Sequence, residues 1–110
     1  MPIESFQNQT LRPILKFQHE LTIALLKNHR NYKIDQVPDS TRDKYAAFLS
    51  KYVQSNLDLK NQLLGVILGF FTTDEMSFYK DQRKELNRRI IQMQLKRYVD
   101  TAFSVTMREE

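Results

Sequence analysis

The chain has 110 residues, a mass of 13.2 kDa and a formal net charge of +4, a size that suits one compact domain. Its composition, 41% hydrophobic and 27% charged, excludes a disordered chain. The absence of cysteine excludes disulfides, thiolate metal sites and thiol nucleophiles. The longest apolar run, 63–71, is too short to cross a bilayer. The first five residues do not resemble a secretory signal, so we expect a cytoplasmic protein with no membrane association.

Helix breakers are scarce in this sequence. It contains two Gly and three Pro, and every Pro lies before residue 39. Long stretches without these residues favour helices. We therefore predict an all-α fold, a four-helix bundle-like single domain over residues 1–110 with a long C-terminal helix.

The first predicted helix covers about 11–30. Pro13 falls inside its apolar pattern, but with Thr10 as the N-cap this proline stands in the first turn, where a missing amide hydrogen costs little. Residues 1–9 are then expected to form an N-terminal arm or short turn. Residues 31–39 are expected to form the longest connection.

The second predicted helix covers 41–54. It follows a capping box in which Ser40 caps the helix and Asp43 reaches back. Apolar residues then recur at helical spacing and form one stripe. The residues expected in the core of the domain are Tyr45, Phe48, Leu49, Tyr52, Leu63, Ile67, Leu86 and Ile90.

The third predicted helix covers 56–70, after a second capping signal that begins at Ser55. A buried strand at 66–68 is the alternative, because periodicity alone does not settle a short apolar run between glycines.

The fourth predicted helix covers 73–103 and follows a cap at Thr72. No Gly or Pro interrupts the sequence beyond it, so one long helix is expected, with 104–110 as a frayed tail. A bend around 80–84 is the alternative, because helices of this length often curve.

The two glycines, Gly65 and Gly69, are four residues apart and would leave one helix face without side chains. This spacing allows another helix to approach closely. Close helix packing at these two positions is the main prediction, and a ligand or hinge role is the lesser alternative.

The sequence contains no catalytic signature. There is no Gly-x-Ser-x-Gly elbow, phosphate loop or dinucleotide fingerprint. The two histidines, His19 and His29, are ten residues apart on one predicted helix and point in different directions, so they cannot share a metal ion. We predict no catalytic residue, metal or cofactor, although an enzyme with a site assembled from scattered residues is left open.

Surplus positive charge is concentrated in the segment 80–97, which holds seven basic and two acidic residues. Such a segment is typical of proteins that bind phosphate groups or acidic partners. The alternative, favoured because the charges spread around the helix, is a solvated surface with ion pairs such as Glu85 with Arg88 or Arg89. The candidate anion or nucleic-acid contacts are Lys80, Lys84, Arg88, Arg89 and Lys96.

The fourth predicted helix carries two apolar rows that lie side by side along its surface. A helix in a small bundle usually buries only one such row, which leaves the second to be explained. We predict that this row mediates self-association as a homodimer, with Arg97 reaching Asp100 of the partner subunit. The alternative is that the first helix covers both rows within one chain. The row consists of Ile91, Leu95, Tyr98 and Ala102.

These patterns favour a small, non-enzymatic helical interaction module that self-associates and binds an unidentified protein partner. The alternative is a nucleic-acid-binding protein that uses the basic segment of the C-terminal helix.

Two stretches of the sequence carry a resemblance to known proteins. The segments 4–16 and 65–72 resemble a group of short all-helical bacterial proteins of unknown function, which often carry an inherited glyoxalase label. The resemblance implies a bacterial, cytoplasmic protein and supplies no functional residue. The label is not supported, because metal-dependent glyoxalases hold their His and Glu ligands on strands, and this sequence offers neither.

Overall fold

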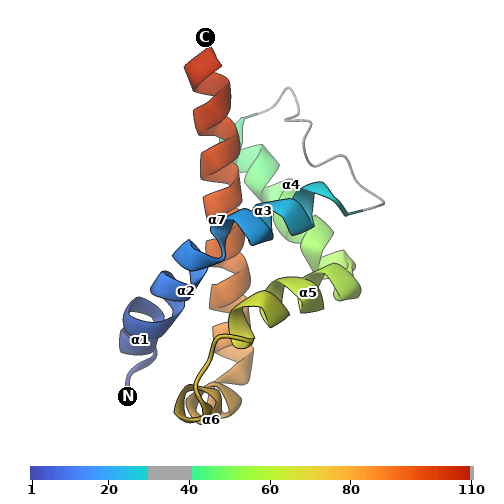
Figure 1. Ribbon diagram of the computed structural model, residues 1–110. Helices are drawn as coiled ribbons and strands as arrows, with labels where there is room; N and C mark the ends of the chain where they lie inside the picture. The colour runs from blue at the N-terminus through green and yellow to red at the C-terminus, as the bar shows by residue number, and fades with distance from the viewer. Residues whose placement is uncertain (30–40, 110) are drawn as a thin grey trace.

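Helices make up nearly all of the described part of the chain, which in this computed structural model is residues 1–29 and 41–109 (Figure 1). Side chains are described up to residue 103. No strand occurs within these ranges, so the predicted all-α fold is confirmed and the alternative strand at 66–68 is wrong. The expected connection at 31–39 and the expected cap at Ser40 lie outside the described residues.

The N-terminal segment is helical from its third residue onward. It comprises α1 (Ile3–Phe6), the π-helical turn η1 (Gln7–Leu11) and α2 (Arg12–Phe17). The segment 1–9, expected as an N-terminal arm or short turn, thus consists of short helical turns from Ile3 onward. The wider π turn ends just before Pro13, whose missing amide hydrogen would leave a gap in a regular α-helical ladder.

Thr10 is not a helix cap as expected, because it lies inside η1. It is buried, and its hydroxyl donates to Glu75 Oε2 at 3.2 Å. Thr10 therefore ties the N-terminal segment to the start of a distant helix.

A kink at Gln18 divides the predicted first helix into α2 and α3 (His19–Lys27). The backbone of Gln18 departs from helical geometry, with φ −95° and ψ 15°. No Gly or Pro marks this position. The Gln18 side chain instead donates to the carbonyl of Val66 at 3.1 Å, so a tertiary contact holds the kink.

The next two helices, α4 (Arg42–Ser55) and α5 (Leu57–Leu68), form a hairpin. Thr41 caps α4 by accepting from the Lys44 amide. The expected cap of α5 is wrong, because Ser55 belongs to α4 and its hydroxyl donates back to the carbonyl of Lys51. Ser55 thus ends one helix instead of starting the next.

The cap predicted at Thr72 is confirmed at the start of α6 (Thr73–Asp81), where it takes the form of a capping box. The Thr72 hydroxyl accepts from the Glu75 amide at 3.1 Å, and the Glu75 carboxylate accepts from the Thr72 amide at 2.8 Å. Both bonds are local in sequence, which is why the pattern alone predicted them.

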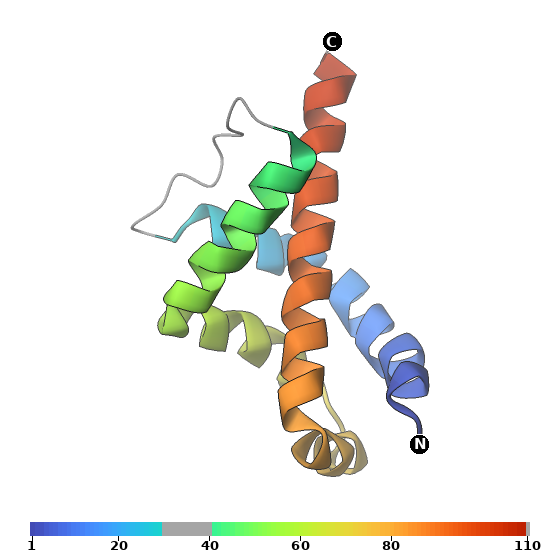
Figure 2. The same ribbon diagram turned by 180° about the vertical axis from the view of Figure 1, so that it is seen from behind.

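The C-terminal helix is α7 (Arg83–Glu109), which is separated from α6 by a break at Gln82. One continuous helix over 73–103 is therefore wrong, and the alternative bend at 80–84 is confirmed. Figure 2 shows α6 turned across the lower end of α7. The backbone of α7 is helical to Glu109.

The core surrounds α7, which packs against α3, α4, α5 and α6 (Figure 1). Six of the eight residues predicted for the core are fully buried: Tyr45, Leu49, Leu63, Ile67, Leu86 and Ile90. Tyr52 is only half-buried, and the prediction for Phe48 is wrong because this residue is 45% exposed. On α4 the buried positions recur every four residues, and Phe48 lies beside that stripe. Among the described residues no helix has both the length and the apolar character needed to cross a membrane.

Candidate functional site

The apolar row predicted to mediate self-association lies inside the folded chain. Ile91, Leu95 and Tyr98 are only 8%, 6% and 3% exposed, and Ala102 is half-buried. Leu95 faces α4 and Tyr98 faces α3. The prediction of a docking row is therefore wrong. The alternative, in which the first helix covers both rows within one chain, holds only in part, because α4 covers Leu95. Neighbouring helices decide which apolar rows remain exposed, and sequence periodicity does not show this.

The contact expected between Arg97 and Asp100 of the partner subunit is replaced by contacts within the chain. Arg97 Nε donates to His19 Nδ1 at 3.3 Å. The Asp100 carboxylate pairs with Arg42 and with Lys96, whose ammonium lies 3.1 Å away.

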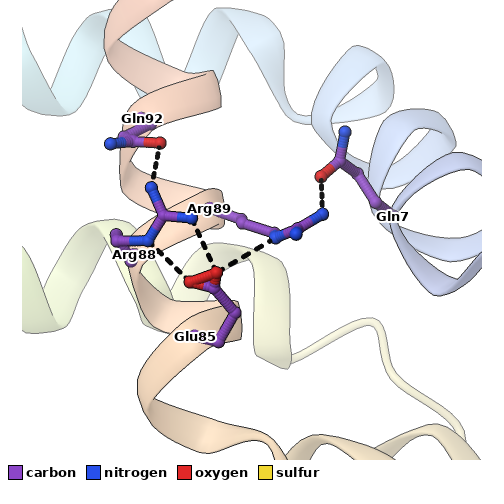
Figure 3. A network of polar contacts seen from close by, with 5 residues as sticks. All are labelled: Gln7, Glu85, Arg88, Arg89 and Gln92. Atoms are coloured by element: carbon purple, nitrogen blue, oxygen red, sulfur yellow. Dashed lines mark hydrogen bonds and ion pairs between the residues drawn. The ribbon is translucent and has the colours of Figure 1, made fainter. Parts of the chain in front are cut away.

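Part of the basic segment is neutralised by Glu85, as the ion-pair alternative predicted (Figure 3). Arg88 donates to both oxygens of this carboxylate at 2.6 Å, and Arg89 Nε donates at 3.4 Å. These bonds, with Arg88 first, lower the pKa of Glu85 to about 2, and Glu85 in turn raises the pKa of Arg88. Arg89 also donates to Gln7 Oε1 at 2.9 Å, which joins α7 to η1.

The five candidate anion contacts therefore fall into two groups. Arg88, Arg89 and Lys96 are engaged by carboxylates of α7 itself. Lys80 and Lys84 are exposed, and no ion pair within the described residues engages them. The positive charge that remains for a phosphate group is thus concentrated around the break between α6 and α7.

The close helix packing predicted at Gly65 and Gly69 does not occur among the residues that the structure describes. Both residues are exposed. A Cβ atom at Gly65 would meet nothing within 4 Å, and one at Gly69 would meet only the Gly65 carbonyl, 3.3 Å away. Neither glycine has a positive φ angle. Gly65 lies inside α5, where glycine costs about 1 kcal/mol relative to alanine, and no contact among the described residues offsets that cost.

Large apolar side chains lie beside these glycines. Phe17 is 72% exposed, Phe70 49% and Leu21 44%. The rings of Phe17 and Phe70 meet edge to face with centroids 5.2 Å apart. The Gln18 bond to Val66 brings α2 and α3 against α5 next to Gly65. We call the surface formed by Phe17, Leu21, Gly65, Gly69 and Phe70 the α5 face.

This face adjoins the longest uncharged part of α5. No charged residue occurs from Asn61 to Thr73, although 27% of the whole chain is charged. Depletion of charge around exposed aromatic residues is the compositional signature of the centre of a protein interface. The sequence pattern identified the glycines, but only the tertiary structure shows that Phe17 and Phe70 are exposed beside them.

A groove between α3 and α5 has a volume of about 550 Å³. At one end His29 Nδ1 lies 2.5 Å from the Tyr52 hydroxyl. Burial raises the pKa of Tyr52, as does the negative charge of Asp58. The phenol therefore keeps its proton at neutral pH, so this pair is not an activated nucleophile.

Among the described residues, no three His, Asp or Glu side chains lie close enough together to hold a metal ion. Comparisons of the chain with protein-family models, curated proteins and solved structures found no match. The resemblance to short helical bacterial proteins therefore stays a prediction.

Proposed function

We propose that this chain is a small, cytoplasmic, non-enzymatic interaction module that forms a homodimer through the α5 face. The carrying observation is that Gly65 and Gly69 lie exposed beside the Phe17–Phe70 pair. Neither glycine carries a side chain, so a stretch of α5 backbone is left uncovered near the phenylalanines, and we call this stretch the glycine hollow.

A second copy of the chain suits this surface because the projecting Phe17 and Phe70 rings and the glycine hollow lie side by side on one face. A two-fold interface requires a patch that is complementary to itself. If two α5 helices cross antiparallel near the glycines, the Phe70 ring of each copy meets the glycine hollow of the other. A close approach of the two backbones explains why glycine occurs at these positions, because a larger side chain would keep the two helices apart.

The charge distribution also favours a second copy at this position. Each chain carries a net charge of +4, so two copies repel each other over most of their surface. The α5 face avoids this repulsion because the sequence from Asn61 to Thr73 is uncharged.

The size of the face limits the strength of the dimer. With about 200 Å² per phenylalanine, exposed fractions of 72% and 49% give roughly 240 Å² of apolar surface from the two rings. A standard interface buries about 800 Å² per partner, so polar neighbours such as Gln62 and Thr72 must contribute. We therefore expect a dissociation constant in the micromolar range.

Sedimentation velocity from roughly 5 to 200 µM tests this proposal, because that range brackets a micromolar dimer. The wild type is compared with Gly65→Glu, which places a charge in the hollow, and with Ala47→Glu, which adds the same charge at an exposed position on α4. We expect concentration-dependent dimers for the wild type and for Ala47→Glu, and monomers for Gly65→Glu. Circular dichroism confirms that each variant is folded.

Gly65→Ala gives a second readout that separates folding from association. The added methyl group meets nothing in the single chain, so it stabilises the monomer by about 1 kcal/mol through helix propensity. The same methyl group fills part of the hollow and weakens the dimer. A monomeric wild type at 200 µM, or dimers unaffected by both Gly65 variants, would show that the proposal is wrong.

The nucleic-acid alternative retains Lys80 and Lys84 as its support. It is the weaker of the two proposals, because Arg88 and Arg89 pair with Glu85 and Lys96 pairs with Asp100.

A further inference from the structure

Three consecutive residues at the kink between α2 and α3 make contacts with three different parts of the chain. Phe17 contacts Phe70, which follows α5. Gln18 donates to the carbonyl of Val66 within α5. His19 contacts α7 through two side-chain bonds. The position of the kink, and of the exposed Phe17 beside it, therefore depends on contacts to both α5 and α7.

The protonation state of His19 follows from its partners. Arg97 Nε lies 3.3 Å from His19 Nδ1, and arginine can only donate, so Nδ1 must carry a lone pair. The hydrogen of the neutral ring is then on Nε2, which lies 3.3 Å from the Thr101 hydroxyl oxygen and donates to it. The bond from Arg97 thus requires a neutral imidazole, whereas the bond to Thr101 needs only the hydrogen on Nε2.

A proton added to Nδ1 would remove the acceptor for Arg97 and place two positive groups against each other. The remaining groups from α7 near this site, Gln94 and Tyr98, are uncharged side chains that line the same small cavity. On the N-terminal side, Lys16 and Glu20 are the charged neighbours of His19 in sequence, and both are exposed. No carboxylate among the described residues pairs with His19 to compensate the added charge.

We infer that His19 makes the α5 face sensitive to pH, because acidification releases the kink from α7 and lets Phe17 and Leu21 move out of register with the glycine hollow. The dimer forms when the imidazole is neutral and weakens when the imidazole gains a proton. This inference rests on the proposed homodimer, since it assigns a control to the same face.

The test is the dimer dissociation constant of three proteins, measured by sedimentation at about pH 7.5 and pH 5.5. For the wild type we expect a dissociation constant at least ~5-fold larger at the lower pH. His19→Gln keeps an acceptor for Arg97 and a donor for Thr101 but does not titrate, so its dimer should show no such change. His29→Gln is the matched control and should behave like the wild type. Equal pH dependence in the wild type and in His19→Gln would overturn the inference.

A monomeric background separates this inference from the proposed function. In Gly65→Glu, we expect a lower urea midpoint at pH 5.5 than at pH 7.5, and His19→Gln in the same background should remove the difference. If no dimer forms at either pH but this difference appears, the proposed dimer is wrong and the His19 contact is still pH-sensitive. If dimers form and the urea midpoint is independent of pH in both proteins, the dimer stands and the His19 inference is wrong.

Discussion

Gln94 on α7 donates its side-chain amide to the backbone carbonyl of Leu63 on α5, at a distance of 2.8 Å. Gln94 is only 1% exposed, and Leu63 is fully buried. This bond fixes the register between the two helices at the centre of the core. The other end of the same amide, Oε1, is buried without a hydrogen-bond partner among the described residues.

Replacing Gln94 tests whether the hydrogen bond to Leu63 stabilises the fold more than the unpaired buried oxygen destabilises it. Gln94→Leu removes one hydrogen bond of about 1 kcal/mol and also removes an unpaired buried oxygen that costs about 1–3 kcal/mol. We therefore expect the free energy of unfolding of Gln94→Leu to equal that of the wild type or to exceed it by about 1 kcal/mol. Gln94→Ala should lose about 2–3 kcal/mol, because it leaves a cavity.

Urea unfolding at neutral pH measures both variants. A loss of more than about 2 kcal/mol in Gln94→Leu would show that the bond to Leu63 outweighs the unpaired oxygen.

The Glu85 carboxylate should titrate far below an ordinary glutamate. Its folded pKa is lowered from 4.5 to about 2, chiefly by the hydrogen bonds from Arg88. The stability that these bonds supply is therefore present above pH 4.5 and is lost as the pH falls through about 2. Carboxyl-carbon NMR titration should give this value for the wild type and a value nearer 4.5 for Arg88→Ala.

The control for this titration is Lys96→Ala, which removes a cation that pairs with Asp100 and not with Glu85. It should leave the pKa of Glu85 unchanged. An ordinary pKa for Glu85 in the wild type would mean that the network in Figure 3 does not persist in solution.

Binding to nucleic acid should be weak and only moderately dependent on salt. Lys80, Arg83 and Lys84 are the exposed cations of the basic segment without a carboxylate partner among the described residues. Neutralisation of three phosphates gives a slope of log K against log salt of roughly −3.

Fluorescence anisotropy with labelled duplex DNA and RNA, from low to physiological salt, measures this slope. A slope much steeper than about −3 would show that Arg88, Arg89 and Lys96 leave their carboxylates to contact phosphates, and would favour the nucleic-acid alternative. Lys80→Gln with Lys84→Gln should reduce the slope, whereas Lys44→Gln on α4 should not.

The sequence alone determined the helical class of the fold and those helix ends that depend on local bonds. The capping box joins Thr72 and Glu75, which are three residues apart, so its hydrogen bonds depend on the local sequence and not on the packing of other helices. The fully buried positions of α4 and α5, such as Leu49 and Ile67, follow from helical periodicity in the same way.

Only the tertiary structure decided where helices break and which apolar faces stay exposed. The kink at Gln18 has no Gly or Pro to mark it and coincides with a bond to Val66, which is 48 residues away in the sequence. The sequence predicts that the row from Ile91 to Ala102 is a dimer interface and that Gly65 and Gly69 pack closely against another helix. In the fold α3 and α4 cover the row, while Gly65 stays open. Periodicity describes one helix at a time, and the choice between covered and exposed faces depends on how all the helices pack.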